Sequence, residues 1–220
     1  MHGMTRLGLA ALCAAWLFLD PLAMHGANAP AGRTAKPSGK PAAPPARAQS
    51  IPRDPYVGAI LVDVGAKRVL FEDRADAQGY PASVLKLMDL LIILERIERG
   101  QLSFQDEVPV SAKAAATGGS QVWLAEKEVF TVDEMLYALM VKSANDAAVA
   151  LAEKVAGSTS AFIDLMNRRA GELGMTSTRF SSVHGLPPGP GQAHDVTTAR
   201  ALARLCYAVF QQRDALGYTS

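Results

Sequence analysis

The most continuous apolar run in the body of the chain covers residues 84–97. Leucine, isoleucine and methionine fill most positions, so a helix built from this run has no clean polar face, which is typical of a helix surrounded by protein. Pro81 disfavours the α conformation for the residue before it, and Gly100 is a residue type that commonly follows a helix. The pattern therefore predicts a buried helix over residues 83–99.

Shorter elements are predicted on either side of this helix. Residues 56–64 and 68–72 are β-rich runs separated by Gly65-Ala66-Lys67, which predicts an antiparallel hairpin. Thr131 and Glu134 form a capping box that predicts the start of a helix ending near Lys142. The remaining elements are a short strand at 108–110 and helices at 145–156, 161–173 and 197–212. The second half of the chain is therefore expected to be mainly helical.

Composition narrows the class of protein. The chain has 220 residues, of which 49% are hydrophobic, so it is long enough to bury a core. Its net charge of +1 argues against nucleic acid as the main partner. Apart from Cys13, which lies in the first apolar run, Cys206 is the only cysteine. An internal disulfide is therefore not expected once that run is removed.

The first residues have the features of a secretory signal. Arg6 precedes an apolar run at 7–19 that is too short to span a bilayer comfortably, and Ala27-Asn28-Ala29 is the expected cleavage site. We therefore expect a signal peptide at residues 1–29 and an exported protein, in the periplasm or at the outer face of the cytoplasmic membrane. Pro30 is a poor neighbour for cleavage, so an uncleaved anchor or a peripheral membrane association stays open.

Two further segments complete the expected domain organisation. Residues 30–54 are rich in Pro, Ala, Gly and basic residues and poor in large apolar ones, which predicts a disordered linker. Residues 55–220 then form one folded domain.

Ser83 and Lys86 are the first candidates for chemistry. Positions three apart share a helix face, and a lysine within an apolar run loses hydration, which lowers its pKa or demands a partner. Such a pair suits a nucleophile beside its base. The structural alternative is that Ser83 is an ordinary helix cap, and that Lys86 extends to solvent and pairs with Asp89.

Ser143 and Asn145 form a second candidate pair, at the junction of two apolar helices. Serine and asparagine are common in caps and turns, so this pair is ambiguous by itself. Both side chains are nevertheless placed to reach the cleft that would hold Ser83 and Lys86. A zinc site built from His184, His194 and Asp195 is not favoured, because the chain has no His-Glu-x-x-His motif.

Taken together, these motifs resemble the penicillin-binding serine D-Ala-D-Ala carboxypeptidases of low molecular mass. The order is Pro-Ala-Ser-x-x-Lys ending at Lys86, a Gly-Gly-Ser loop ending at Ser120, Ser-Ala-Asn-Asp-Ala-Ala from Ser143, and His-Gly-Leu from His184. The resemblance implies an α+β fold of the β-lactamase/transpeptidase type, in which an antiparallel sheet packs against a helical cluster. It spans residues 55–212.

The resemblance also implies roles for the candidate residues. Ser83 would be acylated, Lys86 would act as the unprotonated general base, Ser143 would pass a proton to the leaving D-alanine, and Asn145 would hold Lys86 and the substrate amide. The amide of Ser83 would donate to the oxyanion. The implied partners are the D-Ala-D-Ala stem peptide of peptidoglycan and β-lactam inhibitors, and no cofactor is implied.

Two departures from the family pattern lead to alternatives. The third family motif, Lys-Thr-Gly or Lys-Ser-Gly, is absent from the 220 residues, and the simplest expectation is a chain truncated before its C-terminal strands. Asp89 replaces the small polar residue usual in relatives, and a carboxylate there would favour the protonated form of Lys86. The alternatives are therefore a DD-endopeptidase of the same superfamily and a non-catalytic, peptidoglycan-binding fragment. Ala144 disfavours a class A β-lactamase, which carries Asp at this position.

Overall fold

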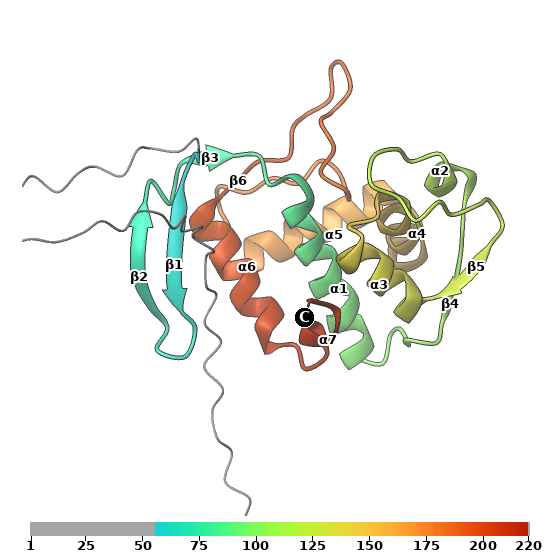
Figure 1. The fold of residues 1–220 in the computed structure, drawn as a ribbon, viewed down its shortest axis with the longest axis horizontal. Helices are drawn as coiled ribbons and strands as arrows, with labels where there is room; N and C mark the ends of the chain where they lie inside the picture. Colours follow the sequence, from blue (N-terminus) through green and yellow to red (C-terminus); the bar gives the residue numbers. More distant parts are fainter. Residues whose placement is uncertain (1–55, 220) are drawn as a thin grey trace, which may run out of the picture. The chain divides into compact units, whose positions relative to one another are not determined.

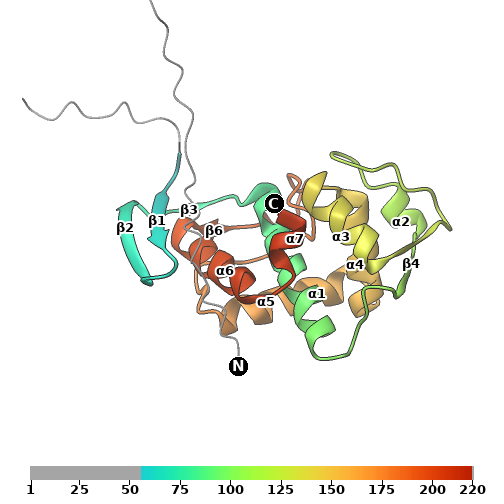
Figure 2. The ribbon, with the colours of Figure 1, turned by 60° about the horizontal axis from the view of Figure 1, so that its bottom comes forward.

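The computed structural model describes residues 56–219, so the predicted signal peptide and nearly all of the predicted linker lie outside the described residues. Helix α1 (Lys86–Glu98) is the centre of the packing. Figures 1 and 2 show it between α6 (Ala199–Gln211) on one side and α3 (Val132–Val141) and α4 (Asn145–Ala156) on the other. Helix α5 (Thr159–Glu172) also packs against α1. The prediction of a helix surrounded by protein is confirmed.

The start of this helix differs from the prediction. Residues Ala82–Leu85 form a 3-10 turn, η1, and α-helical geometry begins only at Lys86. The turn has no side-chain cap, so Ser83 is not the helix cap that the structural alternative required. Side chains at i and i+3 eclipse one another in a 3-10 turn, which brings Ser83 and Lys86 closer together than ideal α geometry would.

The predicted hairpin is confirmed. Strands β1 (Ala59–Asp63) and β2 (Arg68–Asp73) pair antiparallel, with an irregularity in register between Leu61 and Val62. The Asp63 carboxylate accepts a hydrogen bond from the amide of Ala66, which closes the turn. Strand β1 packs against α6, so the sheet lies beside the helical cluster (Figure 1), and the α+β expectation holds.

Several short elements escaped prediction because their sequences carry little hydrophobic period. Strand β3 (Gln78–Gly79) pairs with β6 (Thr197–Thr198), and β5 (Val129–Thr131) pairs with β4 (Glu107–Pro109), which confirms the short strand predicted at 108–110. Helices α2 (Ala112–Ala115) and α7 (Ala215–Thr219) are only one turn long. The β3–β6 pair matters for the site, since it fixes the chain just before η1 to the segment that enters α6.

The first residue of each of the helices α3, α5 and α6 is set by the capping residue or strand that precedes it. The Thr131–Glu134 capping box is present at the start of α3, as predicted. Helix α5 begins two residues earlier than predicted, because Ser158 caps it by accepting from the amide of Ala161. Helix α6 begins two residues later, at Ala199, because Thr197 and Thr198 are used in β6. Among residues 56–219, no helix is long and apolar enough to cross a membrane.

Gly171 in α5 is expected to be a site for stabilisation. It is exposed, and a Cβ added there would have no atom within 4 Å. Gly171→Ala should raise the free energy of unfolding by about 0.5 kcal/mol, because alanine restricts the unfolded chain and favours the helix. Urea denaturation would measure it, with Gly174→Ala as the contrast. Gly174 has φ +68°, and an added Cβ would lie 2.7 Å from the Arg204 guanidinium, so that variant should be destabilised. Equal or lower stability of Gly171→Ala would contradict the expectation.

Candidate active site

Ser83 lies exposed on η1, three residues before Lys86, the buried first residue of α1. The preceding residue, Ala82, has φ +47°, a left-handed conformation that is costly for a residue with a side chain. Gly185 packs directly against this turn, since a Cβ added to Gly185 would lie 2.2 Å from the Ala82 carbonyl oxygen and 3.0 Å from the Ser83 amide nitrogen. The turn that carries Ser83 is therefore held by backbone contact from a distant segment.

Lys86 is the hub of the site. It is only 2% exposed, so it does not extend to solvent as the structural alternative proposed. Its Nζ lies 3.1 Å from Ser83 Oγ, 3.2 Å from Ser143 Oγ, 2.7 Å from Asn145 Oδ1 and 3.2 Å from the carbonyl oxygen of His184. All four predicted site residues are thus brought together around one nitrogen, and the His184 carbonyl joins them.

Three of the four oxygen neighbours match the bonding capacity of a neutral amine, and the fourth, Ser143 Oγ, lies 3.2 Å away as a second hydroxyl within reach. A neutral lysine has two N–H donors and one lone pair. The carbonyl oxygens of Asn145 and His184 only accept, so they take both donors. The lone pair is then left to accept from a hydroxyl, and Ser83 Oγ at 3.1 Å is a suitable donor. The arrangement accommodates Lys86 as the base form beside a serine that can give up its proton.

Burial makes the base form accessible near neutral pH. The loss of hydration lowers the pKa of Lys86 from its usual 10.5 to about 8. The nearby carboxyls of Asp89 and Asp146 act in the opposite direction, so the expected effect of Asp89 is present but burial outweighs it. The same burial, together with the charge of Lys86, lowers the pKa of the His184 imidazole.

The junction between α3 and α4 places the second pair of residues. Ser143 has φ +57°, which turns the chain sharply after α3, and α4 starts at Asn145 without a side-chain cap. Left-handed backbone at a residue other than glycine is costly and tends to occur at functional sites. The turn points Ser143 Oγ and Asn145 Oδ1 at the same lysine from positions two residues apart.

The Gly-Gly-Ser loop holds this junction in place. The Asn145 side-chain amide donates to the Gly118 carbonyl at 2.8 Å, and the Asn145 backbone amide donates to the Ser120 carbonyl at 2.7 Å. Ser120 Oγ donates in turn to the Lys142 carbonyl at 2.7 Å. Between them, Gly119 has φ +83°, and a Cβ there would lie 2.5 Å from Asn145 Nδ2. The glycine pair thus serves close approach of backbone to Asn145.

Asp146 is a structural residue that sequence reasoning passed over. It is fully buried, and its carboxylate accepts from the amides of Val122, Leu124 and Ala147. It therefore ties the start of α4 to the loop that follows Ser120. Its signal in the sequence was an acidic residue directly after Asn145, within an otherwise apolar helix.

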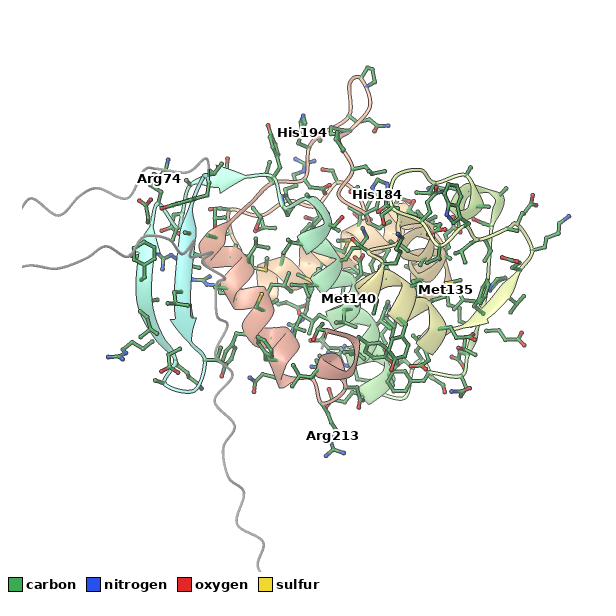
Figure 3. The ribbon with its side chains drawn as sticks, in the orientation of Figure 1. Arg74, Met135, Met140, His184, His194 and Arg213 are labelled. Carbon is green, nitrogen blue, oxygen red and sulfur yellow. The ribbon has the colours of Figure 1, made fainter. Side chains whose placement is uncertain are left out.

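A second network supports the His184 carbonyl. Ser182 Oγ accepts from the Gly185 amide at 2.9 Å and donates to Asp195 Oδ2 at 2.6 Å. The other oxygen of Asp195 accepts from the amides of Ser181 and Ser182. Figure 3 shows His184 near the start of α1, on the segment between α5 and β6. These bonds hold the turn that contacts both Lys86 and η1.

Comparison with known proteins agrees with this arrangement. Residues 49–219 match the family model described as D-alanyl-D-alanine carboxypeptidase. The chain is 39% identical over 152 residues to the D-alanyl-D-alanine carboxypeptidase DacC of Escherichia coli, covering 66% of this chain and 37% of that protein. It is 34% identical over 150 residues to the E. coli D-alanyl-D-alanine endopeptidase, covering 68% and 46% of the two chains.

Solved structures give the same result. The D-alanyl-D-alanine carboxypeptidase DacD of Francisella tularensis superposes with a TM-score of 0.68 at 34% identity, covering 72% of this chain and 38% of that one. Penicillin-binding protein D2 of Listeria monocytogenes, in its ampicillin-bound form, superposes with a TM-score of 0.65 at 27% identity, covering 74% and 65% of the two chains.

The match extends over most of this chain but over only part of its relatives. The chain spans between a third and a half of the length of the curated relatives reported above. The family model nevertheless covers more than three quarters of the chain's 220 residues, in the order and fold that the motifs predicted. The chain belongs to the D-alanyl-D-alanine carboxypeptidase family, peptidase family S11.

Proposed function

We propose that this chain carries the catalytic residues of a serine D-Ala-D-Ala carboxypeptidase, which removes the terminal D-alanine from peptidoglycan stem peptides through an acyl-enzyme on Ser83. The observation that carries the proposal is the buried Lys86 nitrogen, 3.1 Å from Ser83 Oγ and oriented by Asn145 and the His184 carbonyl. Serine acylation requires a nucleophile within reach of a base that is oriented by a third group. A cofactor has no part in this proposal.

The proposed steps use the residues around Lys86. Ser83 Oγ attacks the carbonyl carbon of the penultimate D-alanine, and its proton passes to Lys86 Nζ. The tetrahedral intermediate collapses, and the amine of the terminal D-alanine leaves with a proton delivered through Ser143. The Ser83 amide is proposed as one oxyanion donor. Water then attacks the acyl carbon and gives a proton to Lys86, and Lys86 returns a proton to Ser83 Oγ as the ester bond breaks and the shortened peptide leaves.

β-Lactams are proposed to acylate the same serine. Their strained amide presents a carbonyl to Ser83 as the peptide would, and the ring-opened product remains as an ester on Oγ. A solved relative carries ampicillin. This proposal makes penicillin a convenient probe of Ser83 that does not depend on the identity of the natural peptide.

A DD-endopeptidase is the second candidate, because the matched relatives include an E. coli protein of that name. Digestion of purified muropeptides separates the two. The carboxypeptidase proposal predicts release of free D-alanine from an uncross-linked pentapeptide, absent with Ser83→Ala. Cleavage of cross-linked dimers without release of D-alanine would replace it with the endopeptidase. Binding to peptidoglycan without either product would favour the non-catalytic alternative.

An exported location is proposed together with this function. Its support is the sequence of residues 1–29, and peptidoglycan lies outside the cytoplasmic membrane. Fractionation of cells that express the full chain, followed by N-terminal sequencing, would test it. Protein found in the cytoplasm with an intact N-terminus would contradict the proposal.

A further inference from the structure

Asp89 is a buried carboxyl for which the proposed mechanism has no use. It lies on α1 three positions after Lys86, where the two residues share a face of the helix. It is 2% exposed, and neither of its oxygens has a hydrogen-bond partner within residues 56–219. Buried polar groups are nearly always hydrogen-bonded, so an unpartnered carboxyl inside a site calls for an explanation.

The nearby carboxyl of Asp195 is in a different environment. Asp195 accepts from the amides of Ser181 and Ser182 and from Ser182 Oγ, so three donors satisfy its oxygens. Asp89 has no such donors. Burial therefore raises the pKa of Asp89 well above its usual value; the cation of Lys86 opposes the rise and the charge of Asp195 adds to it.

Other charged groups also surround Lys86. Asp146 on α4 favours its ammonium form. The imidazole of His184, on the segment before β6, interacts unfavourably with it when protonated, and Lys113 on α2 acts on His184 in turn. Asp146 is occupied by three backbone amides. Asp89 is therefore the acidic group whose charge has no partner other than Lys86 itself.

We propose that Asp89 is a positioning residue for Lys86, whose carboxylate holds a proton on Lys86 and so sets the pH above which the lysine is the free base. No ion pair within 4 Å joins the two groups among the described residues, so the coupling is electrostatic and acts through a poorly solvated interior. The pair titrates as a unit, in which a charge on one group favours the opposite charge on the other. This inference rests on the proposed role of Lys86 as base.

The test is the pH profile of acylation by benzylpenicillin. In the parent, the second-order rate should rise through an acidic limb near pH 8, because Lys86 must lose its proton and burial places its pKa at about 8. Asp89→Asn keeps the shape of the side chain and removes its charge. The acidic limb of the acylation rate of Asp89→Asn should lie about one pH unit lower than that of the parent. At pH values below the limb, the variant should therefore be acylated about tenfold faster, and the plateau rate at high pH should change little.

Two variants complete the design. Glu98→Gln removes the same charge from the exposed end of the same helix and should leave the limb in place. Asp89→Thr is a smaller uncharged variant, to be measured if Asp89→Asn does not fold. If the acidic limb of the rate profile stayed at the same pH in the folded variant, the inference would be overturned. A lower plateau rate together with that unmoved limb would mean that Asp89 has a structural role alone. A parent that forms no adduct at any pH would instead contradict the proposed function.

A second measurement does not depend on activity. A carboxyl whose folded-state pKa is raised destabilises the protein as pH rises above its unfolded value of about 4, because the unfolded chain ionises first. Asp89→Asn has no carboxyl at this position, so its stability does not fall with rising pH for this reason. The melting temperature of the variant minus that of the parent should therefore become more positive between pH 4 and pH 7. A difference that continued to rise up to pH 8 would overturn the inference even if the enzyme were inactive, because Asp89 would then carry no charge in the range where Lys86 titrates.

Discussion

Lys86→Met is expected to lower the rate of acylation of Ser83 by benzylpenicillin by about a thousand-fold, within the range for loss of a general base. Methionine is of similar length and apolar, so it fits the buried position and leaves no uncompensated charge. The fold should therefore survive while the base is lost. Time-resolved mass spectrometry of the adduct would give the rate.

Lys142→Met is the matched control for this variant. Lys142 is exposed and directly precedes Ser143, so its replacement removes the same charge near the same junction. Only its backbone carbonyl, which a side-chain change leaves intact, is used by the Gly-Gly-Ser loop. Its acylation rate should remain close to that of the parent. If Lys86→Met acylated within tenfold of the parent, Lys86 would not be the base.

Gly185→Ala is expected to lower the acylation rate by about a hundred-fold and to destabilise the protein by about 1–3 kcal/mol. An added Cβ would lie 2.2 Å from the Ala82 carbonyl oxygen and 2.4 Å from its carbon, both rigid backbone atoms. Either η1 moves, carrying Ser83 with it, or the His184 carbonyl moves away from Lys86. Each displacement separates groups that must lie within hydrogen-bond distance.

Gly100→Ala separates this contact from the cost of backbone conformation. Gly100 has φ +67°, similar to the +77° of Gly185, but a Cβ there would have no atom within 4 Å. It should therefore lose about 1 kcal/mol of stability and keep the parental acylation rate. Equal acylation rates for Gly185→Ala and the parent would show that the contact with η1 does not position Ser83.

The sequence was sufficient to predict the elements with strong local signals. Helix α1 followed from its apolar run, α3 from its capping box and the hairpin from its two β-rich runs. The β3–β6 pair could not be predicted, because two-residue strands far apart in the chain have no measurable period. Neither could the 3-10 turn at Ser83, which is fixed by contact with Gly185.

The candidate active site also has a part that could be predicted from the sequence and a part that could not. Lys86 and the three residues Ser83, Ser143 and Asn145 that meet around it were predicted from motifs, and their chemical roles remain a proposal. The supports of these residues were not predicted, because Asp146 and the Ser182–Asp195 network act through backbone amides that residue types do not identify. Asp89 was expected to favour the ammonium form of Lys86. Its burial without a partner became evident only from the fold.

The most direct test of the central claim is the intact mass of the protein after incubation with benzylpenicillin, measured on the parent and on Ser83→Ala. Ser83 is exposed, and within residues 56–219 its side-chain hydroxyl is hydrogen-bonded to Lys86 alone, so loss of the hydroxyl should leave the fold intact. We predict a single penicilloyl adduct on the parent and none on the variant. A folded parent without an adduct, or a variant that forms the same adduct, would contradict Ser83 as the nucleophile.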